Sequence, residues 1–91
     1  MKRKDQQTTT QTYETCELKL AALLLAEIPD ASAEIENRNN SIRKTIIITH
    51  PTQYNEEVQK LEKDYINKEA RTGVYAYNRA LNTIRDLLRG N

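Results

Sequence analysis

Four side chains near the end of the chain have the types and the spacing needed to contact nucleic-acid bases. Asparagine and arginine form paired hydrogen bonds with adenine and guanine in the major groove. Residues three or four apart on a helix share one face, and the chain places these residues at such intervals: Asn78, Asn82, Arg85 and Arg89. Residues 71 to 91 also contain four arginines against one acidic residue. The pattern is compatible with a base-reading helix, although a polar stripe beside a buried one is usually the solvated flank of an ordinary helix.

Three basic residues earlier in the chain could add phosphate contacts to that helix. They belong to an expected hairpin: Arg38, Arg43 and Lys44. The whole chain has 14 basic and 13 acidic residues and a net charge of +1, which is not the balance of a strongly basic nucleic-acid binder. A nucleic-acid surface would therefore have to be a local patch.

His50 and Cys16 are the single histidine and the single cysteine of the chain. His50 could be a general base, or an exposed loop residue, and no serine or acid stands at a recognisable motif spacing from it. Cys16 could be an activated thiolate at a helix N-terminus, or a small buried apolar residue. One residue of each kind cannot form a disulfide or a structural zinc site. Two glycines exclude a glycine-rich phosphate loop, so we predict no catalytic residue, metal or cofactor.

The element that must organise the fold is a helix over residues 15 to 28, because leucine, isoleucine and alanine surround most of it. Thr15 is the expected N-cap, and Pro29 ends the helix because proline lacks the backbone donor. A helix this apolar is stable in water only when other elements cover it. Residues 1 to 12 show no apolar period and predict a disordered basic and polar tail. The domain is expected over residues 13 to 91.

A β-hairpin is expected next. Its first arm contains Ile35, its tip is Asn39-Asn40, and its second arm covers residues 42 to 49, where β-branched residues predominate. Alternation places one set of side chains on the helix: Ile42, Lys44, Ile46 and Ile48. His50 and the proline after it are expected to end the strand.

Two amphipathic helices follow, over residues 53 to 68 and 75 to 89, and Thr52 is the expected cap of the first. Their apolar stripes are Tyr54, Val58, Leu61 and Tyr65, and then Val74, Tyr77, Leu81, Ile84 and Leu88. Gly73 between them is free to take a positive φ. The predicted fold is a small two-layer α+β domain in the order helix, β-hairpin, helix, helix.

Leu23 and Ile47 are apolar residues at positions where the pattern calls for polar ones. Leu23 lies between Lys19 and Glu27 in the polar sector of the first helix, and Ile47 lies on the otherwise polar face of the strand. Exposed apolar positions can mark interfaces, although scattered exposed apolar residues are common. These two residues are our candidate partner-binding positions, and an open hairpin edge would also permit a homodimer.

The chain resembles an uncharacterised family of small domains from phages and Firmicutes. The resemblance is carried by Tyr13-x-Thr15-x-x-Leu18-x-Leu20-Ala21-Ala22-x-Leu24 before a hairpin with a β-branched strand. It continues with a tyrosine, here Tyr65, before a glycine-containing turn, and with Tyr77-x-x-Ala80-Leu81-x-x-Ile84-x-x-Leu87-Leu88. Ile28-Pro29-Asp30 departs from the glycine turn usual there. The family has no assigned activity, so the resemblance implies only a phage or mobile-element protein in a bacterial cytoplasm.

These observations lead to one functional prediction and one alternative. The chain is expected to be a non-enzymatic accessory protein that binds a host or phage protein, for example in a defence or regulatory complex. The alternative is a small nucleic-acid-binding regulator that uses the last helix and the hairpin. No membrane segment is expected, because the longest apolar run, residues 21 to 26, is too short to cross a bilayer.

Overall fold

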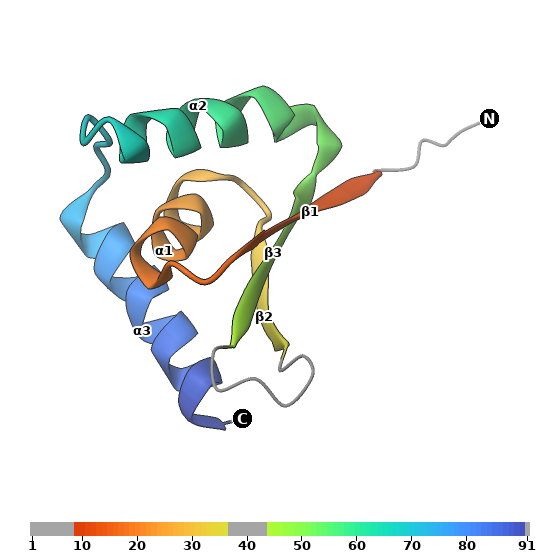
Figure 1. Cartoon of the computed structure of the whole chain (residues 1–91), viewed down its shortest axis with the longest axis vertical. Helices are drawn as coiled ribbons and strands as arrows, with labels where there is room; N and C mark the ends of the chain where they lie inside the picture. The colour runs from red at the N-terminus through yellow and green to blue at the C-terminus, as the bar shows by residue number, and fades with distance from the viewer. Residues whose placement is uncertain (1–8, 37–43, 91) are drawn as a thin grey trace.

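The computed structural model describes residues 9 to 36 and 44 to 90, which form three strands and three α-helices. In chain order these are β1 (Thr10–Thr15), α1 (Leu18–Glu27), β2 (Ser32–Glu36), β3 (Thr45–Pro51), a 3-10 helix η2 (Thr52–Tyr54), α2 (Asn55–Ile66) and α3 (Val74–Gly90). The chain is a small α+β domain, as predicted (Figure 1). The predicted order is retained, with one additional strand before the first helix.

The central element is α1, which Figure 1 shows nearly end-on between the sheet, α2 and α3. Its buried side chains are Leu20, Ala21, Ala22, Leu23 and Leu24. The backbone N–H of Ile28 donates to the carbonyl of Leu24 at 2.9 Å and closes the last turn just before Pro29. The expectation that the other elements cover this leucine-rich helix is confirmed.

The helix starts later than predicted. Thr15 ends β1, and Glu17 occupies the N-cap position of α1 without a side-chain capping bond. The Thr15 hydroxyl instead accepts a hydrogen bond from the backbone N–H of Glu17 at 3.0 Å. Its polar side chain therefore supports the turn from strand to helix, and not the first turn of the helix.

The sheet has the order β1-β3-β2, and both outer strands are antiparallel to β3. The antiparallel pairing of β2 with β3 confirms the predicted hairpin arms, while its expected tip at Asn39-Asn40 lies outside the described residues. The prediction that residues 10 to 12 belong to a disordered tail is wrong, because they form the first half of β1. They are held by a strand far along the chain, since Thr12 stands opposite Thr49.

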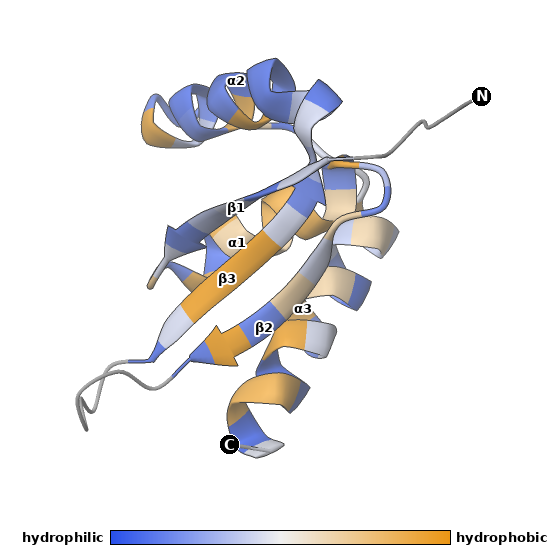
Figure 2. Cartoon of the chain, turned by 90° about the vertical axis from the view of Figure 1, so that its right-hand side faces the viewer, coloured by the Kyte–Doolittle hydropathy of each residue, from blue (hydrophilic) through white to orange (hydrophobic). Residues whose placement is uncertain are grey.

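The sheet has a buried face and an outer face. Ile46 and Ile48 are buried against the helices, as the alternation predicted. His50 follows in the same alternation and is also buried, with 2% of its surface exposed, so its expected position in a loop after the strand is wrong. The strand continues through Pro51 because β1 extends the pairing as far as Thr10. Figure 2 shows the outer face with α1 and α3 behind the sheet.

Both predicted stripes of the later helices pack on α1. Val58 of α2 is buried, and the remaining stripe residues are partly buried: Tyr54 at the end of η2, and Leu61 and Tyr65 of α2. This helix begins at Asn55, after η2, and has no side-chain capping bond, so the expected cap by Thr52 is wrong. Gly73 does not have a positive φ, and among the described residues positive φ values occur at Asp30 and Lys68.

The α3 stripe is confirmed except at its first position. Ile84 is buried, and Tyr77, Leu81 and Leu88 pack partly buried against the core. Val74 is 76% exposed, because it begins the helix at the edge of the packed region. Ala80 is buried in addition, and its small side chain fits the close contact of α3 with α1 and β2.

Candidate binding surfaces

The outer face of the sheet has an apolar centre surrounded by polar and acidic side chains. Residues that stand opposite each other in an antiparallel sheet point to the same side, so Glu14, Ile47 and Glu34 form one row across the three strands. The neighbouring row contains hydroxyls: Thr12, Thr49 and Ser32. Ile47 is partly buried between its neighbours and is absent from the core cluster. Its predicted position on the face away from the helices is confirmed.

Leu23 is not part of any surface. Only 2% of it is exposed, which overturns its expected place in a polar sector of the first helix. The connection between α2 and α3 covers that sector, because Leu23 lines a small cavity of about 230 Å³ together with Ala70 and Tyr77. The hydroxyl of Thr72 also donates to the carboxylate of Glu27 and closes the same side. Leu23 is a core residue, and Ile47 alone remains a candidate partner-binding position.

A groove of about 750 Å³ runs between the β1–α1 corner and the inner side of α2. Its walls carry Tyr13, Thr15, Glu17, Leu20, Glu62, Tyr65, Ile66, Lys68 and Ala70. Nothing in the residue spacing indicated this groove, because its two walls come from segments about fifty residues apart. The only local signal is that tyrosines and glutamates occur in both segments.

Two tyrosine–glutamate hydrogen bonds cross this groove in opposite directions. The Tyr13 hydroxyl donates to Glu62 Oε2 at 2.6 Å, and the Tyr65 hydroxyl donates to Glu17 Oε1 at 3.4 Å. Burial and the neighbouring Glu62 carboxylate raise the pKa of Tyr13 well above its usual range. Burial and the charge of Glu17 also raise the pKa of Tyr65. Both phenols are therefore neutral donors, and both carboxylates keep acceptor sites in addition to those used.

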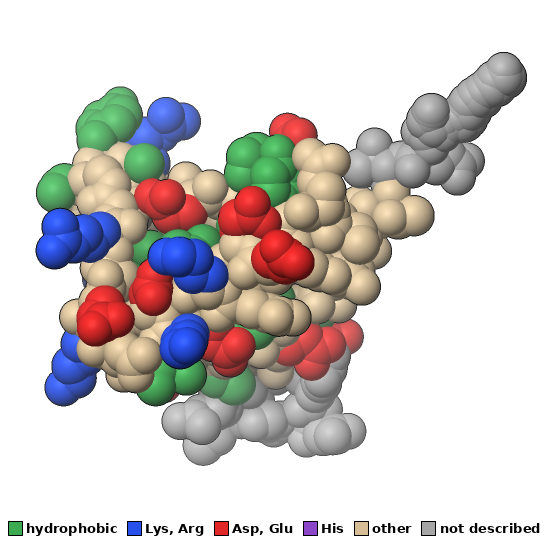
Figure 3. Space-filling model, turned by 90° about the horizontal axis from the view of Figure 1, so that it is seen from above, with side chains coloured by type: hydrophobic (Ala, Val, Ile, Leu, Met, Phe, Trp, Pro, Cys, Tyr) green, Lys and Arg blue, Asp and Glu red, His purple; other side chains and the backbone are tan. Residues whose placement is uncertain are grey.

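The outer surface of α2 has charges of both signs. Figure 3, which views the molecule from this side, shows acidic and basic side chains interspersed. Lys60 Nζ lies 3.0 Å from Asp64 Oδ2, one helical turn away. Exposed pairs of this kind contribute only a few tenths of a kcal/mol. This surface has the character of a solvated helix face.

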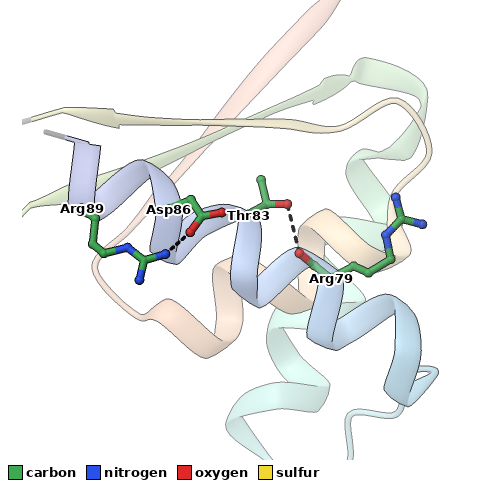
Figure 4. Close-up of polar contacts among 4 residues, drawn as sticks. All are labelled: Arg79, Thr83, Asp86 and Arg89. Carbon is green, nitrogen blue, oxygen red and sulfur yellow. Dashed lines mark hydrogen bonds and ion pairs between the residues drawn. The ribbon is translucent and has the colours of Figure 1, made fainter.

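The four predicted base-contacting residues of α3 are all exposed. Arg89 forms an ion pair with Asp86, and the Thr83 hydroxyl donates to the carbonyl of Arg79 at 3.0 Å (Figure 4). The guanidinium of Arg79 lies 5.7 Å from the ring centre of Tyr75. One end of the helix therefore has an arginine in an ion pair, and the other has an arginine on an aromatic ring.

The expected contribution of the hairpin to this surface is only partly described. Lys44 Nζ donates to the carbonyl of Leu88 at 3.2 Å, so it binds the end of α3. A lysine at this position also complements the negative end of the helix dipole. Arg38 and Arg43 lie outside the described residues.

Neither of the two residues considered for catalysis lines the groove, although Cys16 lies between two residues that do, Thr15 and Glu17. His50 Nδ1 is 3.0 Å from the carbonyl oxygen of Pro51, in the buried part of the sheet. Cys16 is exposed between β1 and α1, so the interpretation of it as a small buried apolar residue is wrong. The described residues contain no group of three or more metal-ligating side chains. Within the same residues no helix is both long enough and apolar enough to cross a membrane.

No protein-family model, curated protein or solved structure was found to match the chain.

Proposed function

We propose that the chain is a non-enzymatic accessory protein that binds another protein through the outer face of its sheet. The observation that carries this proposal is the position of Ile47, an aliphatic side chain at the centre of a sheet face that no described helix covers. An apolar centre with a polar rim is the usual composition of a protein–protein contact. The acidic residues beside it favour a partner surface with lysine or arginine at its edge.

The resemblance to small domains of phages and Firmicutes supports the biological setting of this proposal. A phage or mobile-element protein in a bacterial cytoplasm would meet host and phage proteins as partners. Interference with a host defence or regulatory complex is one form that such binding could take. A second copy of the chain is another candidate partner, and light scattering that gives a monomer at high concentration would remove it.

Capture from bacterial lysate, with and without nuclease, tests the proposal. The wild-type chain should retain a partner after nuclease treatment, and Ile47→Lys should lose it because a charge is placed at the apolar centre. Val74→Lys is the matched control, since Val74 is exposed on α3 and away from the sheet. Retention of the same partner by Ile47→Lys would contradict the proposed surface.

A second candidate function is nucleic-acid binding by α3. The observation that favours it is the exposure of Asn78, Asn82 and Arg85 at helical spacing on one helix. Fluorescence anisotropy with labelled duplex DNA and RNA tests it over a range of salt concentrations, because phosphate contacts make affinity fall with salt. Absence of binding at low ionic strength would remove this candidate, and so would unchanged affinity in Arg85→Gln.

A further inference from the structure

Among the described strands β1 is an outer one, and its edge away from β3 presents backbone hydrogen-bonding groups at Thr10 and Thr12. The backbone N–H of Thr52 donates to the carbonyl of Thr9 at 3.0 Å, and these two residues continue the register that pairs Thr10 with Pro51. In an antiparallel ladder, bonded and non-bonded pairs alternate. Thr10 and Thr12 therefore stand in non-bonded pairs with β3, and their N–H and C=O groups point away from it.

Pro51 supports this assignment of the ladder. Proline has no N–H, so it is tolerated in a strand only where no ladder donor is needed. Pro51 stands opposite Thr10 in a non-bonded pair, and its nitrogen faces the side of β2. β2 begins only at Ser32, which stands opposite Thr49. No β2 residue therefore lies beside Pro51.

The groove described above borders the second half of β1, beyond the outward backbone groups of Thr10 and Thr12. Tyr13 and Thr15 of β1 point into it from the buried side of the sheet, and Glu62 and Ile66 of α2 form its other wall. A strand added beside β1 would place every second side chain in the groove. The six residues of β1 correspond to an edge of roughly 20 Å.

We propose that this edge and groove bind an extended peptide segment of a partner protein, in which basic residues alternate with small ones. The inference rests on the proposed protein-binding function and names the chemistry of the partner. The peptide would add a fourth strand to the sheet through the backbone groups of Thr10 and Thr12. Its lysine or arginine side chains would enter the groove.

The walls of the groove carry two carboxylates, Glu17 and Glu62, against one cation, Lys68, and this balance favours a basic side chain. Leu20, Ile66 and Ala70 offer aliphatic contact for its methylene stem. The carboxylates of Glu17 and Glu62 accept one phenolic hydrogen bond each, and their remaining lone pairs can accept from an ammonium or guanidinium group. The rings of Tyr13 and Tyr65 beside them favour a cation as well.

Fluorescence polarisation with the full chain and labelled six-residue peptides tests the proposal. The probe alternates threonine and arginine. One control peptide alternates threonine and glutamate, and another has the composition of the probe with its three arginines contiguous. We expect binding of the alternating arginine probe, and binding weaker by about tenfold for each control, because the cation and the alternation are both required.

Two matched pairs of variants test the parts of the site separately. The first pair tests the backbone donor at the β1 edge, and the second tests the groove carboxylates at equal net charge. Thr12→Pro removes an outward donor without removing a bond to β3, and Thr12→Val keeps that donor. Glu17→Gln with Glu62→Gln removes both acidic charges of the groove, and Glu56→Gln with Glu57→Gln makes the same charge change on exposed residues at the start of α2. The first member of each pair should weaken binding by about tenfold, and the second should leave it within about twofold.

Equal binding by Thr12→Pro and Thr12→Val would overturn the proposal, as would equal binding by the two double variants. A dimer in sedimentation that Thr12→Pro dissociates would assign the edge to a second copy of the chain and would also overturn it. Failure here is distinguishable from failure of the proposed function. A lysate partner lost by Ile47→Lys and retained by Thr12→Pro would leave the outer face as the binding surface and exclude the edge.

Discussion

At the scale of single residues, the two tyrosine–glutamate pairs join α2 to the β1–α1 corner by hydrogen bonds between a neutral and a charged group. Such bonds contribute more than those between two neutral groups. They also connect residues 49 and 48 positions apart, so each one constrains the tertiary arrangement. These bonds act together with the packing of Val58 and Leu61 to hold α2 in place.

Replacing Tyr13 by phenylalanine tests this dependence. The variant keeps the ring and loses the donor to Glu62, so we expect a loss of about 1 to 2 kcal/mol in the free energy of unfolding at pH 7, measured by urea denaturation. Tyr75→Phe is the control, because Tyr75 is exposed on α3. An equal effect of both changes would contradict the role given to the Tyr13 hydroxyl.

The same bond predicts a loss of stability in base. The pKa of Tyr13 is raised in the folded chain, so folding favours the protonated phenol. Its contribution is complete below the ordinary tyrosine value of about 10 and declines as the pH rises above it. Thermal unfolding between pH 8 and 11 should show a steeper decline for the wild type than for Tyr13→Phe. Parallel curves would contradict the prediction.

Truncation of Leu23 should destabilise the fold more than truncation of Ile47. Leu23→Ala leaves a cavity in the core and should cost about 2 to 5 kcal/mol in the free energy of unfolding. Ile47→Ala removes a partly exposed side chain from the outer face and should cost about 1 kcal/mol. Chemical denaturation of the two variants measures the difference. Comparable losses would contradict the assignment of Ile47 to an outer surface.

At the scale of elements, the sequence predicted those whose signal is local. The apolar character of α1, the β-branched residues of β3 and the period of α3 each lie within one continuous segment, and each element was found. β1 has no such pattern, because its inward positions include Gln11 and Thr15 and its single large side chain is Tyr13. Its threonine-rich composition was the one available signal of a strand.

The start of α3 offers an element-scale prediction. The carbonyl of Gly73 accepts the N–H of Tyr77 at 2.9 Å, which places Gly73 at the N-cap. A side chain added there would meet no atom within 4 Å, and the residue does not have a positive φ. Gly73→Ser should therefore raise the free energy of unfolding by about 0.5 to 1 kcal/mol through capping and reduced chain entropy. A lower melting temperature would contradict this.

At the scale of the whole molecule, the candidate surfaces depend on contacts between distant segments. The polar sector of α1 that contains Leu23 was assigned to the surface because Lys19 and Glu27 flank it, and only the path of residues 70 to 77 places it inside. The groove likewise exists only where α2 approaches β1. Local periodicity identifies the faces of an element, but it does not determine which later segment covers each face.

Burial is unevenly distributed over the three helices, and this predicts which of them opens first. Val58 is the single buried residue of α2, whereas α1 has five. Segments with few buried contacts open with lower free energy than the global unfolding reaction. Amide hydrogen exchange followed by mass spectrometry should therefore show faster exchange in α2 than in α1 and β3.

Tyr13→Phe should accelerate that exchange further in α2 and leave the rates in α3 unchanged, because the lost bond joins only α2 to β1. If the groove binds the arginine–threonine probe, saturating probe should slow exchange in α2 and at the β1 edge together. If the probe slows amide exchange in α3 instead, then it binds to α3 and not to the groove. Uniform exchange in all three helices would show that the domain opens as one unit and that α2 does not separate from the core.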